Sequence, residues 1–338
     1  MSITAKELAD ILGISPSTIS LVFNGKPGIS ESTIKWVQDG AAQYGSARTK
    51  KDMTSELGKI ITYVIYCRDG SIVSDTAFFS TVMQGIEYEA RRLGYKLAIF
   101  TLYESADLAE QIETLRISGT SGLVLLATEM DKSKLESFSA RGIPIVVIDN
   151  NLITNNIDTV YINNVQSAYC AVEYLISKGH INIGYLASSS RINNFSEREL
   201  GLALALQTIG IGEINPKYRF DIGSTSDTAY RSMKKHIEAG CTFPTAFFAD
   251  NDIIAAGSMR ALKEAGYKMP GDISIIGFDD MPLCEFTEPP LTTMKVPKST
   301  LGILSVGQLD KRIRNDNSCS LSIAVSSELV RRESVRQI

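Results

Sequence analysis

The chain has 338 residues and a net charge of −4, with 44% hydrophobic and 21% charged residues. This length suits more than one folded domain, and the composition is ordinary for a globular protein. No apolar run reaches the roughly 18 residues of a membrane span, and the polar N-terminus does not resemble a signal peptide. We therefore expect a cytoplasmic protein with no membrane partner.

Two short helical patterns around a tight turn open the chain. Leu8 and Leu12 belong to one apolar stripe, and Gly13 can end that first helix in a left-handed conformation. Ser15 can cap the next helix, and Pro16 suits its first position because that N–H has no helical partner. The pattern predicts a helix-turn-helix whose second helix enters a DNA major groove. The alternative is a small helical hairpin that only packs.

Short polar side chains of this region can reach phosphates or base edges, and a third helix is expected after Ser30. The net charge of residues 1–59 is only +1, so DNA affinity must come from local placement and from two copies of the module. Base discrimination is expected at Pro16, Ser17 and Leu21. The expected DNA contacts here are Thr4, Ser15, Pro16, Ser17, Thr18, Ser20, Leu21, Asn24, Ser30 and Tyr44.

From residue 60 onward, short β-rich runs alternate with amphipathic helical patterns in two successive rounds. This alternation predicts an α/β fold with two doubly wound lobes and a ligand cleft beyond the carboxyl ends of the strands. The predicted domains are a headpiece over 1–46, a hinge or linker over 47–59, and an effector-binding and dimerisation core over 60–338. Within the core we expect one lobe over about 60–161 and 292–324, and another over about 162–291 and 325–338.

Several segments, taken in order, resemble the LacI/GalR family of transcriptional repressors over essentially the whole chain. They are SPSTISLVFNGKPGIS (15–30), AVEYLISKGHINIGYLA (171–187), SEREL (196–200), PTAFFADNDIIAAG (244–257) and ISIIGFDDMPL through PPLTTMKVP (273–297). The resemblance implies a DNA-binding headpiece, a hinge, and a core of periplasmic-binding-protein type. It also implies a homodimer that reads an inverted repeat in double-stranded DNA and binds a small effector, expected to be a carbohydrate.

Two departures from the family pattern affect DNA recognition. Family headpieces usually end in Tyr-X-Pro before a hinge helix with a wedging Leu, whereas Tyr44 is followed here by Gly-Ser-Ala. Counting without gaps puts Met53 at the wedge position; the alternative is an ordinary buried linker residue. Leu21 replaces a basic or polar base-reading side chain, so it can touch a thymine methyl group but cannot read guanine.

Matching to the family motifs also yields the candidate effector contacts. Paired carboxylates and amides with an arginine suit the vicinal hydroxyls of a sugar or polyol. Other roles remain open: Asn251 can cap a helix, Asp279 can cap loop amides together with Asp280, and Arg198 can pair with a neighbouring glutamate on the surface. The candidates are Phe79, Asp149, Asn194, Arg198, Asn251 and Asp279.

Catalysis and metal binding find little support in the sequence. It has two histidines, five scattered cysteines without CxxC spacing, and no P-loop, GxSxG or HExxH motif. We therefore expect no enzyme activity, no cofactor and no metal. The predicted function is a DNA-binding repressor controlled by a small effector. The alternatives are the same DNA role controlled by a protein partner such as a phosphocarrier, or a solute-binding receptor.

Overall fold

The computed structural model describes residues 5–23, 29–43, 59–73, 77–139, 142–151, 157–212, 214–315 and 319–338. The chain divides into two compact units: the described residues 5–23 and 29–43 belong to the first, and the described residues that form the two sheets and their helices belong to the second. We describe each unit separately, as the headpiece and the core. None of the described helices is long and apolar enough to cross a membrane.

The headpiece is a three-helix unit with a small apolar core. Gly13, with a φ of 63°, ends the first helix in the left-handed region, as the sequence predicts. The Ser15 hydroxyl caps the second helix by accepting a hydrogen bond of 3.0 Å from the Thr18 N–H. The helices are α1 Ala5–Leu12, α2 Pro16–Phe23 and α3 Glu31–Gln43. Their buried apolar residues are Leu8, Ala9, Ile19, Val22, Val37 and Ala41.

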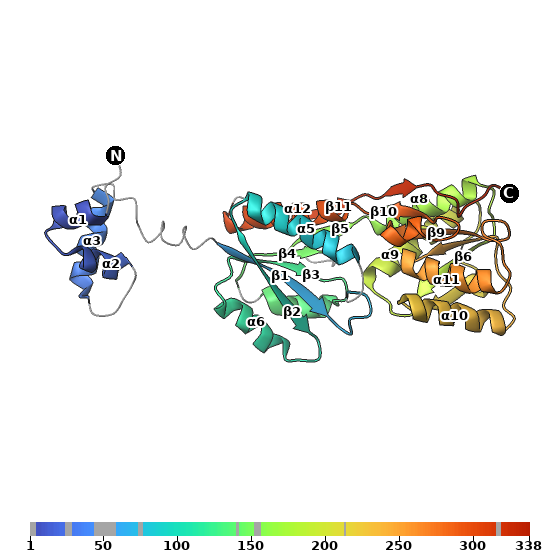
Figure 1. Ribbon diagram of the computed structural model, residues 1–338, viewed down its shortest axis with the longest axis horizontal. Helices are drawn as coiled ribbons and strands as arrows, with labels where there is room; N and C mark the ends of the chain where they lie inside the picture. Colours follow the sequence, from blue (N-terminus) through green and yellow to red (C-terminus); the bar gives the residue numbers. More distant parts are fainter. Residues whose placement is uncertain are drawn as a thin grey trace. The chain divides into compact units, whose positions relative to one another are not determined.

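The first lobe of the core is a six-stranded sheet with strand order β11-β5-β4-β3-β1-β2. The central strand β3 is fully buried and apolar, as expected for a parallel sheet covered on both faces. Helices α5 and α12 lie side by side along this lobe (Figure 1). The elements are β1 Ile60–Cys67, α5 Ala77–Arg92, β2 Lys96–Tyr103, α6 Leu108–Ile117, β3 Gly122–Leu126, α7 Lys132–Ser139, β4 Ile145–Ile148, β5 Asp158–Ile162, α12 Lys298–Ile313 and β11 Ser322–Val325.

The second lobe repeats the plan with strand order β12-β10-β9-β8-β6-β7. Helix α8 packs against α9, and α10 packs against α11. The helices are α8 Asn164–Ser177, α9 Asn193–Gln207, η1 Pro216–Tyr218, α10 Ser226–Glu238, α11 Asp252–Glu264 and η2 Pro282–Glu285. The strands are β6 Ile183–Ser188, β7 Arg219–Ile222, β8 Ala246–Ala249, β9 Ser274–Asp279, β10 Thr292–Lys295 and β12 Glu328–Val330. The two lobes and the headpiece confirm the predicted fold class.

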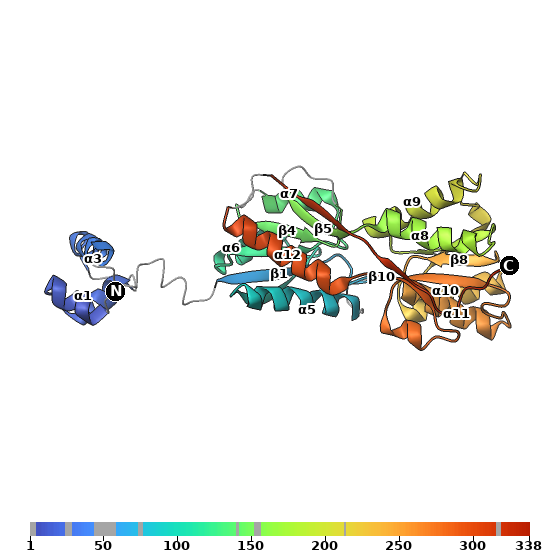
Figure 2. The same ribbon diagram turned by 90° about the horizontal axis from the view of Figure 1, so that it is seen from above.

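One predicted lobe boundary is wrong. Residues 292–295 were expected in the first lobe, but they form β10 of the second sheet, parallel to β9 and antiparallel to β12. The physical reason is local pairing: the buried Thr293 hydroxyl donates a hydrogen bond of 2.5 Å to the Asp252 carboxylate of α11. The chain returns to the first lobe with α12. The C-terminal strand then runs from β11 in one sheet to β12 in the other (Figure 2).

Candidate functional site

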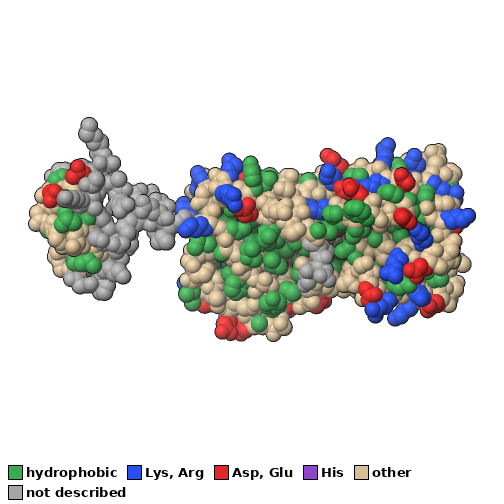
Figure 3. All heavy atoms as spheres, in the orientation of Figure 1, with side chains coloured by type: hydrophobic (Ala, Val, Ile, Leu, Met, Phe, Trp, Pro, Cys, Tyr) green, Lys and Arg blue, Asp and Glu red, His purple; other side chains and the backbone are tan. Residues whose placement is uncertain are grey.

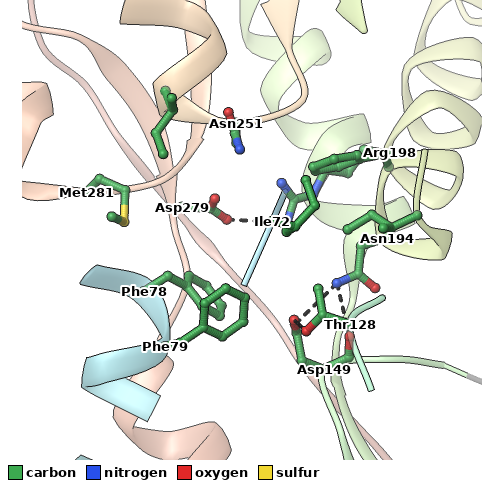
Figure 4. Close-up of a pocket in the computed structure, with 13 residues that line it drawn as sticks. Ile72, Phe78, Phe79, Thr128, Asp149, Asn194, Arg198, Asn251, Asp279 and Met281 are labelled. Atoms are coloured by element: carbon green, nitrogen blue, oxygen red, sulfur yellow. Dashed lines mark hydrogen bonds and ion pairs between the residues drawn. The ribbon is translucent and has the colours of Figure 1, made fainter. Parts of the chain in front are cut away.

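A pocket lies inside the core, between the two sheets, and all six candidate effector residues line it. It holds about 400 Å³ of empty space, part of it open to solvent. Figure 4 shows aromatic side chains on one side and polar side chains converging from the others. The six are Phe79, Asp149, Asn194, Arg198, Asn251 and Asp279.

The polar residues reach the pocket because they follow strands or begin helices at the carboxyl edges of the sheets. Asp149 directly follows β4, Asp279 ends β9, and Asn251 caps α11 just after β8. Asn194 and Arg198 are four residues apart on α9, so they share one face of that helix. Two lobes therefore contribute to one site.

Arg198 is buried and fully engaged with the second lobe. Its Nε donates to Asn164 Oδ1 at 3.0 Å, its Nη1 donates to the backbone oxygen of Asp250, and its Nη2 lies 3.3 Å from Asp279 Oδ1. The guanidinium carbon lies 3.7 Å from the centroid of the Phe278 ring. The alternative that Arg198 pairs with a neighbouring glutamate on the surface is therefore wrong, because the side chain is buried and points inward.

Asp149 joins the two lobes. Its backbone φ of 62° is in the left-handed region, and its Oδ2 accepts a hydrogen bond of 2.6 Å from the Thr128 hydroxyl. Asn194 of the second lobe donates through Nδ2 to the backbone oxygen of Asp149 at 3.1 Å and to Oδ1 at 3.2 Å. These contacts are visible as dashed lines in Figure 4.

Burial raises the pKa of Asp149 to about 7, although the Thr128 hydroxyl and the Arg198 charge both oppose the rise. The pKa values of Asp250 and Asp252 are raised in the same direction by burial, to about 6 and about 7. In the unfolded chain these carboxyls titrate near their ordinary values, so the folded state binds more protons between about pH 4 and pH 7.

This excess of bound protons makes the free energy of unfolding fall as the pH rises through that window. We expect replacement of Asp149 with Asn to flatten the fall, by up to about 1.4 kcal/mol per pH unit. Urea unfolding of both proteins at pH 5, 6, 7 and 8 measures the two slopes. Equal slopes would show that Asp149 titrates normally.

Asn251 and Asp279 each have a structural role beside the pocket. Asn251 Oδ1 accepts a hydrogen bond of 2.9 Å from the Ile254 N–H, so it does cap α11, and its amide nitrogen remains available to a ligand. Asp279 has a φ of 108° and pairs with Arg198 through one oxygen. Asp280 pairs instead with Arg332 at 2.8 Å. The two aspartates thus form separate ion pairs rather than a joint cap of loop amides.

The apolar wall comes from the start of α5. The rings of Phe78 and Phe79 meet edge to face with centroids 5.0 Å apart. Phe78 is buried in the core, while Phe79 is partly exposed and lines the pocket beside Ile72 and Ile192. An aromatic ring in this position can cover the apolar face of a sugar or stack on a planar ring.

Sequence reasoning missed several parts of the site. Thr128 follows β3 as Asp149 follows β4, so the strand-end rule could have found it. Glu129 had no such signal: its buried carboxylate accepts backbone N–H bonds from Arg68 and Val73 at 2.9 and 3.1 Å, and from Ile72 at 2.9 Å. This carboxylate holds the loop that brings Ile72 to the pocket.

The headpiece places its candidate DNA contacts in two groups. Pro16, Ser17 and Leu21 are exposed on α2. Ser15 and Thr18 hydrogen-bond to each other at 2.9 Å, and Ser30 caps α3, so the two serines hold helix ends. The remaining candidates are not placed: the side chain of Ser20 and the residues Thr4, Asn24, Tyr44 and Met53 lie outside what the structure describes.

Known proteins match this organisation. Residues 172–335 match the family described as periplasmic binding protein-like domain, and residues 1–35 match the family described as helix-turn-helix. The HTH-type transcriptional repressor PurR of Mannheimia succiniciproducens is 29% identical over 345 aligned residues, with 99% of each chain covered.

Two solved structures share the fold. A lac repressor dimer bound to operator and the anti-inducer ONPF has a TM-score of 0.74 and 22% identity, covering 99% of this chain and 100% of that chain. A LacI family regulator from Enterococcus faecium with bound ribose has a TM-score of 0.68 and 26% identity. The alignment covers 82% of this chain and 99% of that chain.

A helix-turn-helix headpiece followed by two parallel-sheet lobes defines the class of two-lobed transcriptional regulators. Within that class, the match to PurR over 99% of the chain and the two matched domain families support a regulator of the LacI/GalR type. The resemblance drawn from the sequence motifs is therefore confirmed. The relative compared above is named as a transcriptional repressor.

Proposed function

We propose that this protein is a cytoplasmic repressor, without catalytic activity, whose operator binding is controlled by an uncharged carbohydrate or similar polyol. The observation that carries the proposal is the convergence of Asp149, Asn194, Asn251 and Asp279 on one pocket beside Phe79. Carboxylate and amide groups can pair with adjacent hydroxyls, and the aromatic ring covers the less polar face of a sugar.

Charge in the pocket favours a neutral effector. Asp149 and Asp279 contribute two carboxyl groups, while the one guanidinium lining the pocket, Arg198, already binds Asn164 and Asp279. Lys298 donates to the backbone oxygens of residues 279 and 280. Among the described residues that line the pocket, a phosphate group would therefore meet two acidic side chains and no cation without a partner.

Isothermal titration calorimetry with matched pairs tests this choice. We expect a neutral sugar such as ribose to bind at least tenfold more tightly than its phosphate ester, since each 1.4 kcal/mol of unbalanced charge costs about a factor of ten. Nucleobases belong in the panel because Phe79 could also stack on a planar ring. Tighter binding of the phosphate esters would contradict the proposal.

For the DNA, we propose that α2 enters the major groove, with base discrimination at Pro16, Ser17 and Leu21. The proposal rests on their exposure on a capped helix and on the match of residues 1–35 to a helix-turn-helix. Thr4, Ser20, Asn24 and Tyr44 remain proposed backbone contacts, and Met53 a proposed minor-groove wedge. The test compares the full chain with residues 60–338 on a genomic DNA pool; equal retention would contradict it.

We further propose that two copies associate to read an inverted repeat. β2 is an edge strand of the first sheet, and its Ile99 and Tyr103 side chains are 55% and 53% exposed. Tyr88 of α5 is similarly exposed, and Figure 3 shows hydrophobic side chains gathered over the first lobe. Such an apolar edge is typical of a surface that pairs with another chain.

Replacing Ile99 with Asp is expected to convert the dimer to monomers and to weaken operator binding, because each monomer then contacts a single half-site. Sedimentation velocity at micromolar concentration measures the change. A variant that remains dimeric would place the interface elsewhere.

Control by a protein partner is the remaining alternative. A pull-down from cell extract with the full chain, compared with the calorimetric panel, separates it from control by a small effector. The solute-receptor alternative loses support from the helix-turn-helix match, because a transport receptor needs no DNA-binding unit.

A further inference from the structure

The first two turns of α9 face the first lobe through two side chains. Asn194 lies in the pocket, whereas Glu197, one turn later, is half-buried and does not line it. Glu197 Oε1 accepts a hydrogen bond of 3.1 Å from Nδ2 of Asn151, which belongs to the first lobe just after β4. Its other oxygen, Oε2, accepts a hydrogen bond of 3.0 Å from Nδ2 of Asn164, at the start of α8.

Asn164 connects Glu197 to Arg198 through its side-chain amide. Its side-chain oxygen accepts the 3.0 Å hydrogen bond from Arg198 Nε. Arginine has only donors, so the Asn164 amide must present its oxygen to Arg198 and its nitrogen to Glu197. A carboxylate at residue 197 accepts from that nitrogen, and the orientation of the amide is therefore fixed from both sides. Arg198 in turn reaches Asp279 in the pocket.

We infer that Glu197 is a positioning residue of the effector pocket: it orients Arg198 through Asn164 and ties that orientation to the contact between the lobes through Asn151. The inference rests on the proposed function, because the effector is what Arg198 and Asp279 would help to hold. Its consequence is that lobe closure and the binding geometry of Arg198 form together, through a side chain outside the pocket.

The structure predicts which substitutions this arrangement tolerates. With Glu197→Gln, the amide oxygen can still accept from Asn164, and Asn151 can rotate its own amide to accept from the new NH₂ group. With Glu197→Leu, both hydrogen bonds of residue 197 are lost. The Asn164 amide then keeps only its hydrogen bond with Arg198. Comparing the Gln and Leu variants therefore separates the effect of hydrogen bonding at position 197 from the effect of side-chain size.

Hydrogen exchange on the ligand-free full chain tests whether Glu197 holds the contact between the lobes through Asn151. In Glu197→Leu, we expect amide exchange to rise about tenfold in segment 149–151 and in the 68–73 loop, the value for losing one charge-assisted hydrogen bond. That loop also reaches the second lobe, through the 3.5 Å bond of Arg68 to the backbone oxygen of Arg191. Glu197→Gln and the exposed-surface control Glu173→Leu should exchange as the wild type does.

Calorimetry with D-ribose tests whether Glu197 orients Arg198 for effector binding. We expect about tenfold weaker binding for Glu197→Leu and wild-type binding for Glu197→Gln. If the wild type does not bind ribose, the choice of effector loses support, while the role of Glu197 is still judged on exchange. Wild-type exchange in Glu197→Leu, a rise spread evenly over both lobes, or a Glu197→Gln variant as defective as Glu197→Leu would overturn the inference.

Discussion

Replacing Arg198 with Met is expected to abolish the effect of the effector on operator binding while the ligand-free protein still binds DNA. The substitution keeps the length and much of the volume of the side chain but removes the hydrogen bonds to Asn164, Asp250 and Asp279. Each hydrogen bond of a charged group contributes about 1.5–3 kcal/mol. Without these bonds Asn164 and Asp279 lose the partner that holds them in place at the pocket, and we expect effector binding to weaken by about a hundredfold.

The same change also lowers stability, because it leaves the Asp279 carboxyl partly buried without its cation. A cost of about 3–5 kcal/mol is typical when one partner of a buried pair is removed. Urea unfolding must therefore accompany the binding assay, so that a loss of response is measured on folded protein.

Fluorescence anisotropy on a DNA operator, with and without effector, measures the response. The matched control is Arg198→Lys, which keeps the charge but not the planar fork that serves three partners at once, so we expect it to recover stability more than response. A folded Arg198→Met variant that still responds to effector would show that Arg198 serves only the second lobe. A folded Arg198→Met variant that fails to bind DNA without effector would also show that Arg198 has a structural role only.

The sequence was sufficient to predict six side chains that line the pocket, because their places at strand ends and helix starts also match the family motifs. Asp149 follows β4 of the first sheet, Asp279 ends β9 of the second sheet, and Asn194 and Arg198 share a helix face by their spacing. What Arg198 binds was not predictable in the same way. Its partners Asn164 and Asp250 come from elements 34 and 52 residues away, so their approach depends on how α8, α9 and β8 pack together.

The lobe boundary shows the same limit. A run such as LTTMKVP predicts a strand wherever it is placed, and nothing in its own residues says which sheet it joins. Its place is decided by Thr293, whose hydroxyl meets the buried Asp252, and by β12, which arrives from the end of the chain. Long-range pairing of this kind has no local sequence signal.

Replacing Leu8 with Ala is expected to reduce operator affinity by at least a hundredfold, although Leu8 is fully buried and cannot touch DNA. Among the described residues of the headpiece, six buried apolar residues form the core, and units of this size are marginally stable. A Leu-to-Ala change in a core costs about 2–5 kcal/mol, which is comparable with the whole stability of such a unit. Most headpieces would then be unfolded when they meet DNA.

The matched control is Leu21→Ala, on the exposed face of α2, where the leucine is 39% exposed. This variant should fold normally and change the preference at one base pair by about 1–3 kcal/mol, through a lost contact to a thymine methyl group. Binding to a random DNA pool, followed by sequencing of the retained fraction, distinguishes the two effects. Leu8→Ala should lose retention altogether, whereas Leu21→Ala should retain a different set of sequences.

Because the core packs as a separate unit, calorimetric effector binding should be the same in both variants and in the wild type. Wild-type DNA retention in Leu8→Ala would show that the headpiece has stability beyond what the core around Leu8 provides.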